Sequence, residues 1–198
     1  MCSRRELAVG GICNVTLGSL LGTSSVATYQ EVQVYFDTPV SKMPKRSAGL
    51  MMFRKSNHEL EVFLVHPGGP LWARKDIGAW TIPKGEYEQD ESPLAAARRE
   101  FEEETGFQAA GQFLDLGVIK QKSGKVVTAW AFEGDCDPAD LTSNTCEIQW
   151  PPRSGYRLEI PEVDRGRWFS IEEAQKYIRE EQRPLLDKLC ALPQFGSD

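Results

Sequence analysis

The sequence predicts an α+β domain in which a mixed β-sheet packs between helices. The chain has 198 residues, of which 40% are hydrophobic and 26% charged, a balance typical of a protein that buries a sizeable core. Short apolar runs with strand character occur between longer segments of helical period. Because these segments lack the regular βαβ alternation of a parallel sheet, a mixed sheet with helices on its faces is expected.

The first part of the domain predicts a β-hairpin followed by a loop. Residues 50–54 and 60–65 are apolar runs separated by the turn-forming pair Ser56-Asn57, a pattern typical of two antiparallel strands. The prolines and glycines of residues 67–70 predict a loop. A short strand is expected at residues 80–82, directly before Pro83.

A helix is expected over residues 92–105. Ser92 is a good N-cap, Pro93 occupies the first helical position, and Gly106 follows the last turn, which is the usual distribution of these residues around a helix. The apolar stripe that would pack against the sheet consists of Leu94, Ala97 and Phe101.

The rest of the domain predicts further strands and two shorter helices. Ser170 and Glu173 form a capping box, so a helix is expected to begin there and to run to about Glu180. Strands are expected at residues 113–120 and 126–132, with further candidates at 146–150 and 167–169, and a last short helix at 185–192.

Three glutamates of the first helix carry the chemistry. Glu100, Glu103 and Glu104 are spaced i, i+3 and i+4, so their carboxylates share one helix face. Such like charges repel unless cations lie among them, which predicts a divalent metal site. Carboxylate and water ligands suit Mg²⁺, with Mn²⁺ possible, rather than zinc or copper. Arg99 can brace Glu103 one turn further along. An acidic surface helix is the alternative, which the spacing of the whole motif disfavours.

The stretch from Gly85 to Phe107 resembles the Nudix box. Its fixed residues are Gly85, Glu91, Arg99, Glu100, Phe101, Glu103, Glu104, Gly106 and Phe107, and none departs from the pattern. The resemblance implies an α/β/α sandwich in which the box forms a loop–helix–loop. It also implies a pyrophosphohydrolase that cleaves a phosphoanhydride bond of a nucleoside polyphosphate.

The resemblance also implies roles for the residues of the box. Glu103 and Glu104 would hold the metal, and Glu100 would be a ligand or the base that activates water. The backbone carbonyl of Gly85 would be a further ligand. Glu91 would hold the metal ligands in place without binding the metal itself, and Arg99 would orient the glutamates.

The residue before the box bears on the substrate. Pro83-Lys84-Gly85 is similar to Nudix members that act on dinucleoside polyphosphates, and Lys84 would meet phosphate oxygens as a point charge. We therefore expect a dinucleoside polyphosphate such as diadenosine tetraphosphate as substrate. A pyrophosphohydrolase that removes damaged nucleoside triphosphates is an alternative, and a nucleotide-sensing module without catalysis is another. Lys84 could also be a solvated loop lysine.

Residues outside the box could contact the substrate. Trp72 could stack on a base or close the edge of the core, while Arg74, Lys75 and Arg153 lie in predicted loops from which they could reach phosphate. Glu147 follows the box at a distance where some Nudix enzymes carry one more ligand or base, although a lone glutamate is more often a surface residue.

The composition indicates which binding partners and which cellular compartment to expect. The net charge is −6 with no block of Lys or Arg, which disfavours nucleic acid as a partner. A small nucleotide is therefore the expected substrate. The five cysteines are odd in number and form no CxxC pair, which favours a reducing compartment, and we expect a cytoplasmic enzyme. The sequence does not determine the oligomeric state.

Residues 1–42 are interpreted as an N-terminal extension to a domain at residues 43–198. The extension has no charge between Leu7 and Gln30, but its glycines, serines and threonines make it too polar to span a membrane. It could be an export signal that begins at Ser3-Arg4-Arg5, or an ordered extension with a strand near Val32 and Val34. We favour a third interpretation, in which translation starts at Met43, because no residue before it carries chemistry.

Overall fold

The structure, a computed structural model, describes residues 13–15, 32–34, 44–56, 59–88 and 90–195. By its internal contacts the chain divides into two units, Met1–Met43 and Pro44–Asp198. In the first unit, β1 (Cys13–Val15) pairs antiparallel with β2 (Val32–Val34). Strand character was expected at β2 but not at β1. The signal-like residues 3–5 and the proposed start at residue 43 lie outside the described residues.

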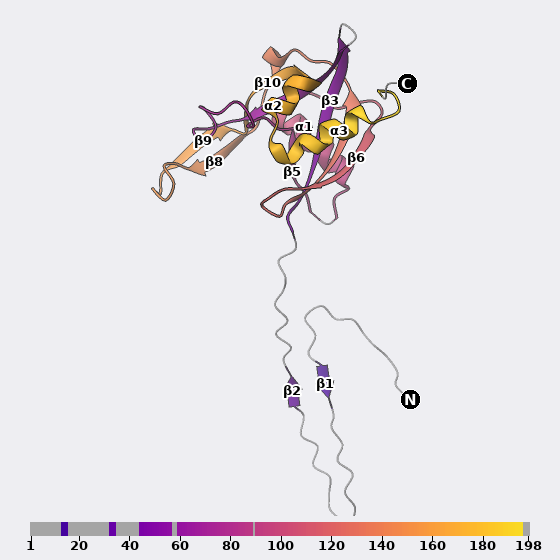
Figure 1. Ribbon diagram of the computed structural model, residues 1–198. Coiled ribbons are helices and arrows are strands. Elements are labelled where there is room, and N and C mark those ends of the chain that lie inside the picture. Colours follow the sequence, from indigo (N-terminus) through magenta and orange to yellow (C-terminus); the bar gives the residue numbers. More distant parts are fainter. Residues whose placement is uncertain (1–12, 16–31, 35–43, 57–58, 89, 196–198) are drawn as a thin grey trace, which may run out of the picture. The chain divides into compact units, whose positions relative to one another are not determined.

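Six strands of the second unit form one mixed sheet (Figure 1). The spatial order is β10-β4-β3-β7-β6, and β5 also pairs with β3. The central strand β3 runs antiparallel to β4 and β5 but parallel to β7, so the predicted mixed sheet is confirmed. The bounds are β3 Arg46–Ser56, β4 Glu59–Pro67, β5 Lys84–Glu86, β6 Leu114–Lys120, β7 Val126–Glu133 and β10 Val163–Ser170.

Helices cover both faces of this sheet. On one face, Phe101 of α1 (Pro93–Thr105) packs with Leu50 and neighbouring side chains. On the other, Leu189 of α3 (Arg183–Cys190) packs with Met51, beside α2 (Ile171–Tyr177). Successive residues of β3 therefore belong to two cores, which explains why the strand is continuously apolar rather than alternating. The expected sandwich is confirmed, and no helix in the described ranges is long and apolar enough to cross a membrane.

A two-stranded ribbon extends from the body of the domain (Figure 1). It consists of β8 (Thr145–Gln149) and β9 (Arg157–Pro161), which pair antiparallel with each other and belong to a sheet of their own. The strand expected at residues 146–150 is thus present, but outside the main sheet. Short 3-10 turns lie at Pro138–Asp140 and Glu180–Gln182.

Two sequence-based expectations need correction. Residues 80–82 form isolated bridges rather than a strand, because the segment divides its backbone hydrogen bonds between two neighbours. Thr81 pairs with Val65 of β4, whereas Trp80 pairs with Ile178. For the same reason α2 ends at Tyr177 instead of about residue 180, since Ile178 is extended (φ −66°, ψ 148°) to pair with Trp80.

Candidate active site

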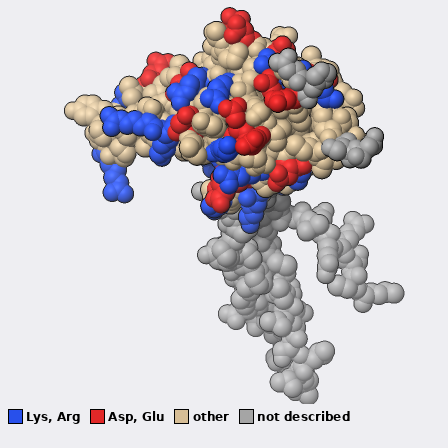
Figure 2. All heavy atoms as spheres, turned by 45° about the horizontal axis from the view of Figure 1, so that its top comes forward, with Lys and Arg blue, Asp and Glu red and all other residues tan. Residues whose placement is uncertain are grey.

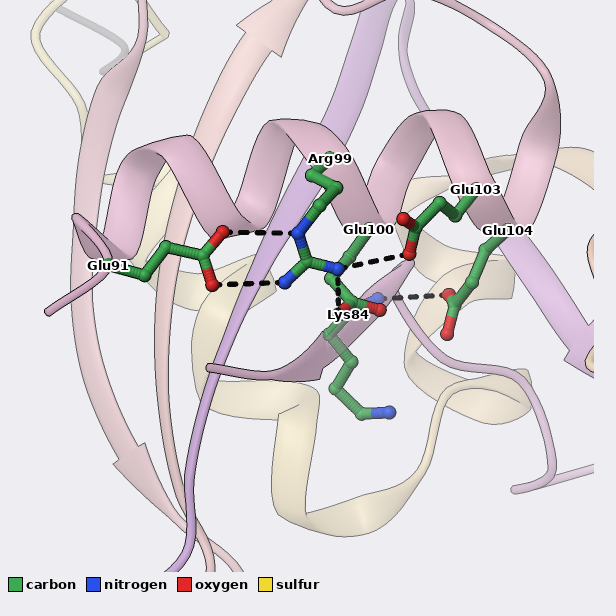
Figure 3. Close-up of polar contacts among 6 residues, drawn as sticks. All are labelled: Lys84, Glu91, Arg99, Glu100, Glu103 and Glu104. Carbon is green, nitrogen blue, oxygen red and sulfur yellow. Dashed lines mark hydrogen bonds and ion pairs between the residues drawn. The ribbon is translucent and has the colours of Figure 1, made fainter. Parts of the chain in front are cut away.

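The glutamate cluster is positioned by α1 packing over β3 and β5. Pro93 starts the helix, and Gly106 ends it in the left-handed conformation (φ 75°), with its N–H donating to the Glu102 carbonyl at 2.7 Å. Ala97 and Phe101 are buried against the sheet. The helix face that carries Glu100, Glu103 and Glu104 consequently lies at the edge of the core, near β5 (Figure 3).

Arg99 joins three carboxylates. Its Nη1 donates to Glu100 Oε1 at 2.7 Å and to Glu103 Oε2 at 3.0 Å, while Nε and Nη2 each donate to one Glu91 oxygen at 3.1 Å (Figure 3). The hydrogen bonds to Glu91, and then those to Glu100, raise the pKa of Arg99, so it stays cationic. Arg99 therefore fixes the direction of both glutamates, and Glu91 in turn fixes Arg99.

Glu104 is the most deeply enclosed carboxylate of the cluster. Its Oε2 accepts a hydrogen bond of 2.9 Å from the backbone N–H of Lys84. Burial raises the pKa of Glu104 to about 7, an effect opposed by the positive charge of Lys84 and reinforced by the negative charges of Glu100 and Glu162. Burial also raises the pKa of Glu100. Both carboxylates are therefore held where an additional cation would stabilise the charged form.

Gly85 brings β5 directly against Glu100. A Cβ at this position would overlap the Glu100 carboxyl group, so any larger residue would displace this carboxylate from its position. Gly85 also pairs with Ala48 of β3. The backbone of residue 85 is thereby fixed next to the glutamate cluster.

The fourth carboxylate of the site is Glu162, which the sequence analysis missed. Two free carbonyls at the end of α1 accept hydrogen bonds from a following loop, Thr105 O from Thr142 N at 3.0 Å and Glu103 O from Asn144 N at 2.9 Å. Asn144 O then accepts from Glu162 N at 2.9 Å. The negative charge of Glu162 raises the pKa values of both Glu100 and Glu104, so its charge acts on the cluster. The only sequence signal is an acidic residue at the start of the last strand.

Glu147, the downstream glutamate that the sequence analysis selected, lies elsewhere. It is exposed on β8, where its Oε2 accepts a hydrogen bond of 2.7 Å from Arg157 of β9. It is not among the charges that shift the pKa of Glu100 or Glu104. The ribbon, rather than the glutamate cluster, is thus the environment of Glu147.

The donor set of the cluster suits a hard cation, although the side chains are not gathered around one point. Among the described residues, no three His, Cys, Asp or Glu side chains are arranged so that they could hold a metal ion as they stand. The reason is that Arg99 holds Glu100 and Glu103, and Lys84 N–H holds Glu104. Within the described part of the chain each of these glutamates still has one carboxylate oxygen without a hydrogen bond, so all-oxygen coordination by Mg²⁺ fits these residues.

The predicted substrate-binding residues fall into three groups. Lys84 adjoins the glutamate cluster through its backbone N–H. Trp72 and Lys75 lie beside Arg179, since Lys75 Nζ is 4.6 Å and Arg179 Cζ is 4.4 Å from the centre of the Trp72 ring. Arg74 is exposed in the same loop. Arg153 lies in the exposed turn between β8 and β9, at the far end of the ribbon (Figure 1), and no hydrogen bond or ion pair within the described residues joins it to the cluster.

The loop that carries Trp72 and Lys75 is anchored to the sheet. The buried ring of His66 on β4 has Nε2 2.8 Å from the Lys75 carbonyl oxygen and Nδ1 2.9 Å from Asp164 Oδ1 on β10. Trp80 Nε1 donates to Asp76 Oδ1 at 2.7 Å. His66 is thus a structural residue, and the loop has a defined position beside the site.

Comparison with known proteins identifies the family. A family model described as the NUDIX domain matches residues 43–189. The chain belongs to the Nudix family. The intact box and the named relatives make this Nudix protein a pyrophosphohydrolase.

Two relatives of this Nudix hydrolase are named for activity on nucleotides or RNA. It is 33% identical over 168 residues to the asymmetrical bis(5'-nucleosyl)-tetraphosphatase of Rattus norvegicus, covering 76% of this chain and 99% of the relative. It is 25% identical to an RNA pyrophosphohydrolase of Bartonella henselae, covering 65% of this chain and 77% of the relative. A solved Ap4A hydrolase complex from C. elegans matches with a TM-score of 0.52 and 24% identity, covering 73% of this chain and 96% of that one, which shows the shared fold.

Proposed function

We propose that this Nudix hydrolase cleaves a dinucleoside polyphosphate such as diadenosine tetraphosphate with Mg²⁺, or alternatively Mn²⁺, as cofactor. The observation that supports this most directly is that Lys84 adjoins the glutamates. Its backbone N–H donates to Glu104, and the charges of Glu104, Arg179 and Glu100 all shift the pKa of its side chain. A metal among the glutamates and cations beside them would together accommodate a chain of phosphates. The name of the rat relative supports the same substrate class.

We infer that the Gly85 carbonyl and the carboxylates of Glu100, Glu103 and Glu104 hold the metal. Their side chains would have to turn toward one another, which the hydrogen bonds of Arg99 and Lys84 allow because one oxygen of each carboxylate remains free of such bonds within the described residues. Bound Mg²⁺ would supply Lewis-acid stabilisation of the charge on the phosphoryl oxygens.

Glu162 is our candidate for the base. In the described residues its carboxylate accepts no hydrogen bond, in contrast to the three box glutamates, so it can take a proton. A water oxygen would form a bond to phosphorus, the bridging P–O bond would break, and the water proton would pass to Glu162. Lys84 would face the negative charge that develops on the leaving phosphate. This assignment replaces Glu147.

Acidic and basic side chains are intermixed on the face drawn in Figure 2, where an RNA-binding enzyme would be expected to show a continuous basic surface. We therefore favour a small nucleotide over RNA, and a cytoplasmic location where such nucleotides occur.

A substrate panel tests the proposal. Purified protein with Mg²⁺ would be assayed against diadenosine tetraphosphate, ATP, an oxidised deoxynucleoside triphosphate and 5'-triphosphorylated RNA. We expect the highest kcat/KM with diadenosine tetraphosphate. A higher value with the oxidised nucleotide or with RNA would refute the substrate class, and binding of nucleotides without turnover of any of them would identify a sensor.

A further inference from the structure

Arg179 is a cation at the edge of the site that the motif does not include. It follows α2 directly, and its backbone N–H donates to Trp80 O at 2.8 Å, while Trp80 N–H donates to Tyr177 O at 3.1 Å. These bonds join the end of α2 to the segment that precedes β5. Arg179 is therefore tied to Trp80, four residues before Lys84, although the two segments are far apart in the sequence.

Its guanidinium group is desolvated without a carboxylate partner. Arg179 Nε is buried and has no hydrogen-bond acceptor within the described residues, and no ion pair of the described residues includes this side chain. Burial lowers the pKa of Arg179, and only the charge of Glu181 opposes the effect. By contrast, Arg54 and Arg99, which are also partly buried, each pair with two or more carboxylates, and Arg167 pairs with one. Burying an unpaired charge is costly, so the arrangement is suited to receiving an anion.

The aromatic ring of Trp72 orients this guanidinium. Arg179 Cζ lies 4.4 Å from the ring centre, a cation–π distance, and Lys75 Nζ approaches the same ring at 4.6 Å. A ring face covered by Arg179 is not open to a nucleotide base. Trp72 is thereby better placed to hold a cation than to stack on a base, the role considered from the sequence.

Lys84 and Arg179 extend the candidate substrate site beyond the glutamate cluster. Lys84 is linked to Glu104 by its backbone N–H. Burial lowers the pKa of the Lys84 side chain, the charge of Glu104 raises it, and the charge of Arg179 lowers it further. Lys84 is thus under the influence of both the glutamate cluster and Arg179, and Arg179 in turn lies over the Trp72 ring, as does Lys75.

We propose that Arg179, oriented by Trp72, binds a phosphate group of the substrate beyond the phosphates at the glutamate cluster and Lys84. The planar guanidinium presents several donors in a fixed fork that matches phosphate oxygens. Arg179 would thereby select substrates with three or more linked phosphates, since a diphosphate would end before reaching it. The inference rests on the proposed function, because it extends the same substrate site.

Binding of inorganic polyphosphates tests this assignment independently of catalysis. Calorimetric titration of the full chain with tripolyphosphate and with pyrophosphate, both with Mg²⁺, would be compared for wild type, Arg179→Gln and Arg179→Lys. The exposed Arg183 is a matched control as Arg183→Gln. We expect Arg179→Gln to lose about tenfold in affinity for tripolyphosphate, with pyrophosphate unchanged. Arg179→Lys should be intermediate because it keeps the charge without the fork, and Arg183→Gln should match wild type.

The outcomes separate this inference from the proposed function. Equal losses for both ligands in Arg179→Gln, or no loss for tripolyphosphate, would overturn the role of Arg179 while leaving the hydrolase intact. If Arg179→Gln does not fold, Arg179→Lys decides, and wild-type tripolyphosphate affinity in that variant would overturn the proposal. If the wild type hydrolyses no dinucleoside polyphosphate but Arg179→Gln still loses tripolyphosphate selectively, the proposed substrate fails and the phosphate-binding role stands.

Discussion

Arg99 and Arg179 are two arginines of the candidate site that differ in their interaction partners. All the hydrogen bonds of Arg99 described here go to carboxylates of the motif, so it organises the glutamates and has little capacity left for substrate. Arg179 has no acidic partner among the described residues and rests on an aromatic ring. The partners of an arginine, rather than its distance from the motif, thus indicate whether it supports the protein or contacts the ligand.

At the residue scale, the first prediction concerns the metal-binding glutamates. Glu104→Gln should lower kcat by on the order of 1,000-fold, because the metal supplies several kcal/mol of transition-state stabilisation. Without metal, the free energy of unfolding should hold or rise, since the change removes one charge from a repelling cluster while the Gln oxygen can still accept from Lys84 N–H. Steady-state kinetics and urea unfolding measure the two effects. Wild-type turnover at saturating Mg²⁺ would refute the ligand assignment.

A second residue-scale prediction separates the two downstream glutamates. Glu162→Gln should lower kcat by about 100-fold or more, as expected for loss of a general base. Glu147→Gln should leave kcat and KM unchanged, because Glu147 lies on the ribbon with Arg157. The two substitutions make the same chemical change and differ only in their position in the fold. A large loss in Glu147→Gln with a small one in Glu162→Gln would reverse our assignment.

At the element scale, the end of α1 links the motif to distant parts of the chain. The carbonyls of Glu103 and Thr105 accept hydrogen bonds from Asn144 and Thr142, and Asn144 positions Glu162. The helix terminus therefore anchors the segments that carry both the proposed metal ligands and the candidate base. This linkage gives Gly106 a role beyond ending the helix.

Gly106→Ala tests this linkage. The substitution should destabilise the domain by ~1–3 kcal/mol, because a side chain is disfavoured at φ 75° and its Cβ would overlap Thr142 Oγ1. Gly124→Ala is the control, since Gly124 also has positive φ (85°) but no atom near its Cβ position. The thermal unfolding temperature and kcat should both fall more for Gly106→Ala than for Gly124→Ala. Equal effects of the two substitutions would show that backbone conformation alone matters.

At the scale of the whole molecule, the chain consists of two units with separate internal contacts. The described residues of the catalytic site all belong to Pro44–Asp198, and the family model matches residues 43–189. The core clusters likewise lie entirely within this unit. The hydrolase domain therefore contains its own core and site.

Deletion of residues 1–42 tests this division. The shortened protein should fold and hydrolyse the same substrate with unchanged kcat/KM, because the core clusters and the candidate site found among the described residues all lie after Met43. Thermal unfolding and kinetics of the two proteins would be compared. Loss of folding on deletion would show that the N-terminal segment is an integral part of the domain.

The sequence alone determined the parts of this protein that local geometry controls. The i, i+3, i+4 spacing of Glu100, Glu103 and Glu104 places them on one helix face, and Arg99 reaches Glu103 one turn on, whatever the surrounding fold. Apolar periodicity likewise predicted the β3–β4 hairpin and α1. These features depend on neighbours a few residues away, so they can be read directly from the order of residues.

The tertiary structure decided what depends on distant neighbours. The parallel pairing of β3 with β7, and the placement of β8 and β9 outside the main sheet, follow from packing and leave no distinctive spacing. Glu162 and Arg179, our proposed site residues, are anchored by backbone hydrogen bonds between segments far apart in the chain, whereas Glu147 lies on the ribbon, bonded to Arg157. An isolated Glu or Arg in a sequence looks like a solvated surface residue, and only the fold shows which charges it meets.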